Sequence, residues 1–196
     1  MTSARDYWDN EASTFDNEPD HGLLDPAVRR AWQVLLEEHL PLPPARIADL
    51  GCGTGTLSVL LARAGHEVHG IDLSGEMVLA ARAKAERAGV DASFAQGDAS
   101  GPDLEMGSFD VVLSRHVLWA LPDPSAALEA WIALLRPEGR LLLVEGRWGT
   151  GTGLSAERCE ALVRKHREAA VVRQLREAVY WGREIDDERY LLISPR

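Results

Sequence analysis

The residues best suited to chemistry surround a glycine-rich stretch, IADLGCGTGTLSVLLARAGHEVHGIDLS, which covers residues 47–74. Gly51, Gly53 and Gly55 follow a short apolar run, and a second apolar run ends in Asp72. A glycine loop between a strand and a helix lets a ligand approach the backbone closely, and a carboxylate at the end of the next strand can accept the hydroxyls of a ribose. The stretch therefore predicts a site for a nucleoside-containing cofactor.

The spacing of the glycines bears on which cofactor that is. A dinucleotide fingerprint reads G-x-G-x-x-G, and its third glycine lets the helix pack closely on the strand beside a pyrophosphate. The sixth position here is Thr56. S-adenosylmethionine (SAM) has no phosphate and brings a sulfonium and an ammonium, so Asp49, at the end of the first apolar run, suits it better. Asp72 does not discriminate, because both cofactors contain a ribose, and the glycine loop alone leaves both open.

Two histidines and two tryptophans could serve a substrate. His116 directly follows an apolar run in SRHVLWALPDP, and His21 lies between two predicted helices. A histidine poised near neutral pH can act as a general base, so both are candidate catalytic residues; packing or loop-structuring roles are the alternatives. Trp119 and Trp148 follow the fourth and fifth predicted strands, where they would line an apolar or aromatic substrate pocket or belong to the rim of the core.

The composition is that of one acidic globular domain. The 196 residues are 45% hydrophobic and 27% charged, with a net charge of −10. This charge disfavours nucleic acid as the main partner, because affinity for phosphates rests on Lys and Arg. We expect no membrane span and no signal peptide, hence a cytoplasmic location, because the chain has no long apolar run. Cys52 and Cys159 have neither metal-site nor disulfide spacing, so no metal is expected.

Helix and strand patterns alternate along most of the chain. Two helices are predicted over residues 7–16 and 26–40, ahead of the glycine loop. The predicted strands RIADL, EVHGID, ASFAQGD, FDVVLSR, GRLLLVEG, AAVVRQL and ERYLLIS follow, with helices over residues 55–64, 74–88, 123–135 and 155–168. This alternation predicts an α/β fold with a doubly wound, mostly parallel sheet, whose ligand lies beyond the carboxyl ends of the strands. Every polar motif described above falls at such an end.

Five segments occur together in the order and spacing of a known family. They are IADLGCGTGTLS, GIDLSGEMV, FAQGDAS, FDVVLSRHVLWALPDP and LLRPEGRLLLVEG. In these segments the chain resembles the class I SAM-dependent methyltransferases, and with the last strand the resemblance covers about residues 46–194. It implies a seven-stranded sheet in the order 3-2-1-4-5-7-6, with the last strand antiparallel and helices on both faces. It also implies SAM as cofactor, S-adenosylhomocysteine as product, an N-terminal helical lid over residues 1–45 and a SAM-binding domain over residues 46–196.

The resemblance further implies roles for single residues. Gly51, Cys52, Gly53 and Gly55 would hold the methionyl chain, with Asp49 at the entrance of the loop. Asp72 would hold the ribose, Leu73 and Met77 would flank the adenine, and Asp98 and Ala99 would hydrogen-bond to it. Arg115 would offer its backbone carbonyl to the ammonium, and either Tyr7 or Trp8 would close over the cofactor.

The methyl acceptor is a separate question. We expect a methyltransferase that acts on a small molecule, because no long insertion separates the fifth strand from the last two and only a small lid remains. The alternatives are a peptide or protein methyltransferase, a pocket completed by a homodimer, and a module that binds SAM without turnover. The basic run RKHRE, residues 164–168, is typical of a solvated helix face; the alternative is a docking site for an acidic partner.

Overall fold

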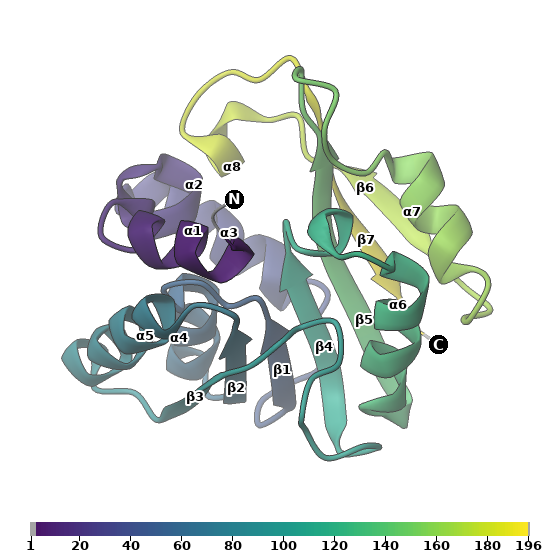
Figure 1. The fold of residues 1–196 in the computed structure, drawn as a ribbon, viewed down its shortest axis with the longest axis horizontal. Helices are drawn as coiled ribbons and strands as arrows, with labels where there is room; N and C mark the ends of the chain where they lie inside the picture. Colours follow the sequence, from purple (N-terminus) through teal and green to yellow (C-terminus); the bar gives the residue numbers. More distant parts are fainter. Residues whose placement is uncertain (1–2, 196) are drawn as a thin grey trace.

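The computed structural model describes residues 3–195 and contains one seven-stranded sheet. The strands are β1 (Arg46–Leu50), β2 (Glu67–Asp72), β3 (Ala92–Gln96), β4 (Phe109–Arg115), β5 (Leu135–Arg147), β6 (Val171–Gln174) and β7 (Glu188–Ser194). They lie in the order β3-β2-β1-β4-β5-β7-β6 (Figure 1). β7 is antiparallel to both β5 and β6, and the other paired strands are parallel. The predicted fold class and strand order are confirmed.

The helices agree with the prediction except at the N-terminus and in some short turns. They are α1 (Ala4–Glu11), η1 (Phe15–Asn17), α2 (Pro19–Gly22), α3 (Pro26–Glu37), α4 (Thr56–Arg63), α5 (Gly75–Ala88), η2 (Leu118–Ala120), α6 (Pro124–Ala133), α7 (Ala156–Val163) and α8 (Ala178–Trp181). The helix predicted over residues 7–16 is divided into α1 and the 3-10 turn η1. No described helix is long and apolar enough to cross a bilayer.

The stretch around His21, predicted as a loop, is the short helix α2. Pro19 occupies the first turn of α2, where its fixed φ suits a helix and its missing N–H costs nothing. Leu23 ends α2 in a left-handed conformation, with φ of 49°. The turn therefore holds the Asp20–His21 pair in a defined position, with the Asp20 side chain buried.

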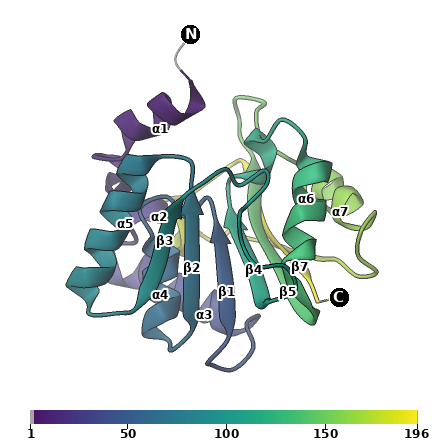
Figure 2. The ribbon, with the colours of Figure 1, turned by 60° about the horizontal axis from the view of Figure 1, so that its bottom comes forward.

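Helices cover both faces of the sheet, and each face has its own core. On one face, α6 and α7 pack over β4, β5 and β7, around Trp131 and Leu143. On the other, α3, α4 and α8 pack around Trp32 and Trp181, while α5 lies against β3 (Figures 1 and 2). The indole of Trp32 donates to the Tyr180 carbonyl at 2.8 Å, which joins the N-terminal helices to the segment before β7.

The register of the parallel strands brings the predicted site residues to one edge. Leu50 pairs with both Ile71 and Ser114, so the loops after β1, β2 and β4 begin at the same level. α1 and α2 lie beyond the tips of these strands (Figure 1). A ligand at this edge is therefore enclosed between the strand ends and the N-terminal segment.

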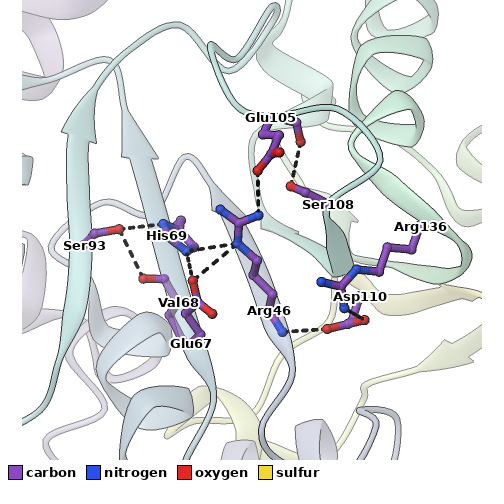
Figure 3. Close-up of polar contacts among 9 residues, drawn as sticks. All are labelled: Arg46, Glu67, Val68, His69, Ser93, Glu105, Ser108, Asp110 and Arg136. Carbon is purple, nitrogen blue, oxygen red and sulfur yellow. Dashed lines mark hydrogen bonds and ion pairs between the residues drawn. The ribbon is translucent and has the colours of Figure 1, made fainter.

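The opposite, amino-terminal edge of the sheet is tied by a polar network (Figure 3). The Arg46 guanidinium pairs with Glu67 at 3.3 Å and with Glu105 at 3.0 Å. His69 Nε2 lies 2.8 Å from Glu67 Oε1, and its Nδ1 lies 2.7 Å from the Ser93 hydroxyl. These contacts link β1, β2 and β3 to the loop before β4. Because Glu67 and Glu105 are exposed to solvent, each pair adds little stability, and the network mainly maintains the register.

Candidate functional site

A cavity of about 530 Å³ opens at the carboxyl edge of the sheet. Most of the predicted site residues line it: Trp8, His21, Gly51, Gly53, Asp72, Leu73, Met77, Asp98, Ala99, Arg115 and His116. A smaller cavity of about 40 Å³ shares Gly51, Gly53, Arg115 and both histidines with it, and adds Asp49 and Cys52. Tyr7 and Gly55 line neither cavity. The topology thus gathers residues from positions 8 to 116 into one place.

The glycine loop packs tightly because Gly51 and Gly55 have no side chain at the points where neighbouring side chains contact them. The Gly51 and Cys52 N–H groups both donate to the Ile71 carbonyl, at 2.8 and 2.9 Å, which folds the loop against β2. Gly51 has φ of 72°, and a Cβ there would overlap the side chain of Val117. Gly55 instead begins α4 with φ of 73° and faces Ala81, so it serves packing rather than the cavity.

The Asp72 side chain, which was predicted to bind a ribose beside the glycine loop, is held in place by backbone hydrogen bonds. Its Oδ2 accepts the Gly53 N–H at 2.8 Å, and its Oδ1 accepts the Ser74 N–H at 2.9 Å. Burial raises the pKa of the Asp72 carboxyl, although these two hydrogen bonds act against the rise. Each carboxylate oxygen keeps a free lone pair, so Asp72 can still accept hydroxyl groups from a ligand.

Asp49 forms the floor of the smaller cavity. The side chain is buried, and the Ser58 hydroxyl donates to Oδ2 at 2.5 Å. Burial raises the pKa of Asp49 to about 6, and the nearby Arg115 guanidinium limits the rise. Asp49 is therefore largely ionised at neutral pH and offers a negative charge in a confined space.

The wall expected to face an adenine is largely apolar. Met77 is buried beside Leu73 at the start of α5, and Ala99 follows β3. Asp98 is exposed to solvent, and its Oδ1 accepts the Ser100 N–H at 2.8 Å. The Ala99 carbonyl accepts the Trp131 indole N–H at 2.6 Å, which fixes the loop after β3.

An aromatic cluster of the N-terminal segment covers the glycine loop. Phe15 stacks on His21, with ring centroids 4.2 Å apart and an interplanar angle of 14°, and Trp8 lies 6.2 Å from Phe15. Tyr7 is 53% exposed, so Trp8 is the residue of the pair that lines the cavity. Phe15, which the sequence analysis did not single out, lines both cavities. Its only sequence signal was an aromatic in a polar stretch.

Polar contacts fasten this segment to the body. Lys84 on α5 lies 2.8 Å from Asp16 Oδ2 and donates to the Thr54 hydroxyl at 2.9 Å. The Ser74 hydroxyl donates to Asp9 at 2.5 Å, beside Asp72. Because α1 buries no side chain completely, these contacts and the aromatic cluster hold it in place.

His116 lies at the meeting point of the two cavities. It has φ of 61°, which is unusual for a residue with a side chain, and its N–H donates to the Val144 carbonyl at 2.8 Å. Its ring packs 5.3 Å from Trp148. Burial lowers the pKa of His116 well below its usual value, and Arg115 adds to the effect. Among the described residues, its Nε2 is buried and has no hydrogen-bond partner, so a neutral imidazole with one unsatisfied nitrogen lies in the cavity wall.

The far end of the cavity contains residues that the sequence analysis missed. Arg183 and Arg189 line it; Arg183 precedes β7, and Arg189 is the second residue of β7. Arg189 lies 3.5 Å from the buried Asp20 and hydrogen-bonds to Asp187 at 2.9 Å. Nothing in the sequence joins positions 20 and 189, because only the tertiary fold brings α2 beside β7. Trp119 and Trp148, which were predicted to line a substrate pocket, border this end, with ring centroids 5.1 Å apart.

The basic run at residues 164–168 lies away from both cavities. Arg164 pairs with Glu160 at 2.8 Å along α7, and Arg167 donates to the Gly139 carbonyl at 2.7 Å. The run follows α7, which ends at Val163 rather than at residue 168 as expected, and Arg167 is half-buried against the sheet edge. The interpretation of the run as a solvated helix face stays a prediction.

Comparisons with known proteins agree with this geometry. Residues 48–143 match the family described as a methyltransferase domain. A ubiquinone biosynthesis O-methyltransferase of Xanthomonas euvesicatoria pv. vesicatoria is 40% identical over 105 residues, which are 53% of this chain and 44% of the relative. Among solved structures, a SAM-dependent methyltransferase of Methanosarcina mazei superposes with a TM-score of 0.66 at 21% identity, covering 83% of this chain and 96% of its own.

A geranyl diphosphate methyltransferase, solved with GPP and sinefungin, superposes with a TM-score of 0.72 at 18% identity, over 85% of this chain and 78% of its own. At these sequence identities the solved structures support only the fold of this chain. The chain spans less than half the length of the curated relative described above. The matched domain and the fold together define a class of protein: residues 48–143 match the methyltransferase domain family, and the chain has the fold of the class I SAM-dependent methyltransferases.

Proposed function

We propose that this chain binds SAM in the 530 Å³ cavity and transfers the methyl group of SAM to a small molecule. The observation that carries the proposal is that one cavity is lined by the glycine loop, by Asp72, which would bind a ribose, and by His116. In this arrangement Asp49, Gly51 and Gly53 would hold the methionyl chain, while Leu73, Met77 and Ala99 would enclose the adenine. Trp8 would close over the cofactor from α1.

The residues fit such a cofactor on physical grounds. Gly51 and Gly53 present bare backbone to the cavity, because Val117 and Phe15 leave little room for a side chain at either position, and the burial of Asp49 favours a cationic partner. When bound, SAM would supply a methyl group on a positively charged sulfur, and a nucleophile that attacks this methyl group displaces the sulfur directly. The protein then has to position the acceptor and exclude water, and orientation alone can lower a barrier by roughly 7–11 kcal/mol.

His116 is the proposed acceptor of the substrate's proton. Burial lowers the pKa of His116, so its imidazole is neutral in the physiological range, and the neutral form is the one that accepts a proton. A base of low pKa removes protons from fairly acidic hydroxyls, so a phenol suits His116 better than an alkyl alcohol. His21, stacked on Phe15, is the second candidate, and burial lowers its pKa as well.

Two features support a small, partly aromatic acceptor. The far end of the cavity is walled by Trp119 and Trp148, and the cavity must hold the cofactor as well as the acceptor. The curated relative is named as an O-methyltransferase of ubiquinone biosynthesis. The net charge of −10 also argues against a nucleic-acid substrate.

Titration calorimetry with SAM and with S-adenosylhomocysteine tests the cofactor. We expect both to bind, and failure of both would overturn the proposal. Transfer from methyl-labelled SAM to a panel of phenols, amines and peptides then tests the acceptor. Labelling of peptides rather than small molecules would favour the protein-methyltransferase alternative. SAM binding without labelled product in a whole-metabolite extract would favour a binding module without turnover. Size-exclusion chromatography with light scattering tests for a homodimer.

A further inference from the structure

The guanidinium of Arg115 lies inside the site rather than at its surface. Arg115 is the last residue of β4, and its side chain lines both cavities. One guanidinium N–H donates to the Asp20 backbone carbonyl, and the group lies 5.3 Å from the centre of the Trp32 ring. Burial lowers the pKa of Arg115, so its positive charge is poorly solvated.

The Arg115 side chain is half-buried and, within the described residues, forms no direct ion pair, although the Asp20, Asp49 and Asp16 carboxylates favour its charged form from a greater distance. Among residues 3–195 no carboxylate lies within ion-pair distance of Arg115, and its only hydrogen bond is to an uncharged carbonyl. Other arginines around the cavity differ: Arg189 contacts both Asp20 and Asp187, and Arg183 lies 3.8 Å from Glu18. A half-buried charge without a direct ion pair is incompletely compensated, so it favours the approach of an anion. Arg115 is therefore the cavity cation that still has the capacity for an anion.

The position of Arg115 beside Asp49 suggests what that anion is. Both residues line the 40 Å³ cavity next to the glycine loop, so this small space presents a negative and a positive group together. An α-amino acid end carries an ammonium and a carboxylate on the same carbon, which is the complementary arrangement. We propose that the Arg115 guanidinium binds the carboxylate of the cofactor's amino-acid end while Asp49 binds its ammonium. This rests on the proposed function, and it assigns the Arg115 side chain a role that the family resemblance gave only to the backbone carbonyl.

The contact between Arg115 and the cofactor's carboxylate would make the site specific for cofactors that carry this carboxylate. Decarboxylated SAM keeps the adenosine, the sulfonium and the ammonium but lacks the carboxylate. It would leave the Arg115 guanidinium without a direct ion pair. The site therefore selects cofactors that retain the carboxylate, because the loss of that one group removes a charge pair in a confined space.

A cycle between two proteins and two ligands isolates this contact. Affinities for SAM and for decarboxylated SAM are measured by calorimetry with the wild type and with Arg115→Gln, whose amide can still donate to the Asp20 carbonyl. We expect the wild type to prefer SAM by about 10-fold or more, and the variant to lose most of that preference by weakening only for SAM. Arg115→Lys, which keeps the charge without the forked geometry, should retain part of the preference.

Arg140→Gln is the matched control. Arg140 also donates a guanidinium N–H to a backbone carbonyl, that of His39 at 2.7 Å, but it lines neither cavity. This variant should leave the preference unchanged. The inference would be overturned if Arg115→Gln lost affinity for SAM and for decarboxylated SAM equally, or if the wild type bound the two ligands equally well. Either result would leave the proposed function intact. A wild type that binds neither ligand would overturn the proposed function itself.

Discussion

The carboxylate of Glu145 and the backbone N–H of Leu118 are 2.8 Å apart, although Glu145 lies on β5 and Leu118 follows β4. The same oxygen, Oε1, accepts the Val117 N–H at 3.1 Å. The turn that places His116 at the cavity is thus held from the neighbouring strand by an acid that does not line the cavity. Among the described residues, its second oxygen, Oε2, has no hydrogen-bond partner.

Glu145→Gln should change how stability depends on pH. Burial raises the pKa of Glu145 from 4.5 to about 8. The folded protein therefore holds a proton that the unfolded chain releases, and this contribution to stability is present below pH 4.5 and lost as pH rises through 8. The amide of glutamine keeps an oxygen for both N–H groups and does not titrate.

Thermal unfolding between pH 5 and 9 measures this effect. The wild type should lose more stability than Glu145→Gln across the range, and the variant should be at least as stable at pH 9. Glu145→Leu, which removes the acceptor, should be less stable than Glu145→Gln throughout. Parallel pH profiles of wild type and Glu145→Gln would show that Glu145 is ionised in the fold.

Gly51→Ala should disrupt the glycine loop. Its φ of 72° disfavours a side chain, and the new methyl group would overlap Val117. We expect a loss of about 1–3 kcal/mol in unfolding free energy, together with loss of S-adenosylhomocysteine binding. Gly149→Ala is the control, because a Cβ there meets no atom within 4 Å. Unchanged binding in Gly51→Ala would mean that the loop does not cradle the ligand.

Cofactor affinity should depend on pH through Asp49. Its pKa of about 6 means that the acid is protonated in the free protein below pH 6, and a protonated carboxyl does not attract an ammonium. Affinity for S-adenosylhomocysteine should therefore fall below pH 6, approaching about 10-fold per pH unit. In Asp49→Asn the affinity should be weak and flat over pH 5–8. A wild-type affinity that stays constant from pH 5 to 8 would contradict this assignment.

His116→Asn tests the proposed base. Asparagine tolerates the left-handed backbone at φ of 61° better than alanine, so the turn should persist. We expect S-adenosylhomocysteine to bind with nearly wild-type affinity while turnover falls by about 100-fold or more. Because burial lowers the pKa of His116, wild-type turnover should not decline between pH 7.5 and 6 through this group. Full turnover in the variant would leave His116 a packing role.

Much of this protein could be predicted from local patterns. The alternation of strands and helices, the glycines before α4 and the starts of the helices expected over residues 74–88 and 123–135 are properties of short segments, and the structure contains them where they were expected. The site at the carboxyl edge followed as well, because parallel strands place their ends together. The N-terminal region was harder to predict: the helix expected over residues 7–16 is divided into α1 and η1, and the stretch expected as a loop after it forms the short helix α2.

The sequence by itself determined the fold class and the set of residues at the cofactor end of the cavity, because spacing within each strand–loop–helix unit decides where those side chains lie. Only the tertiary structure decided the electrostatics. Within residues 3–195 Arg115 has no direct ion pair, Arg189 is paired with Asp20, and Glu145 holds the turn of His116 through contacts between distant segments. Burial and pairing depend on which segments pack together, and that is a property of the whole fold rather than of any stretch of chain.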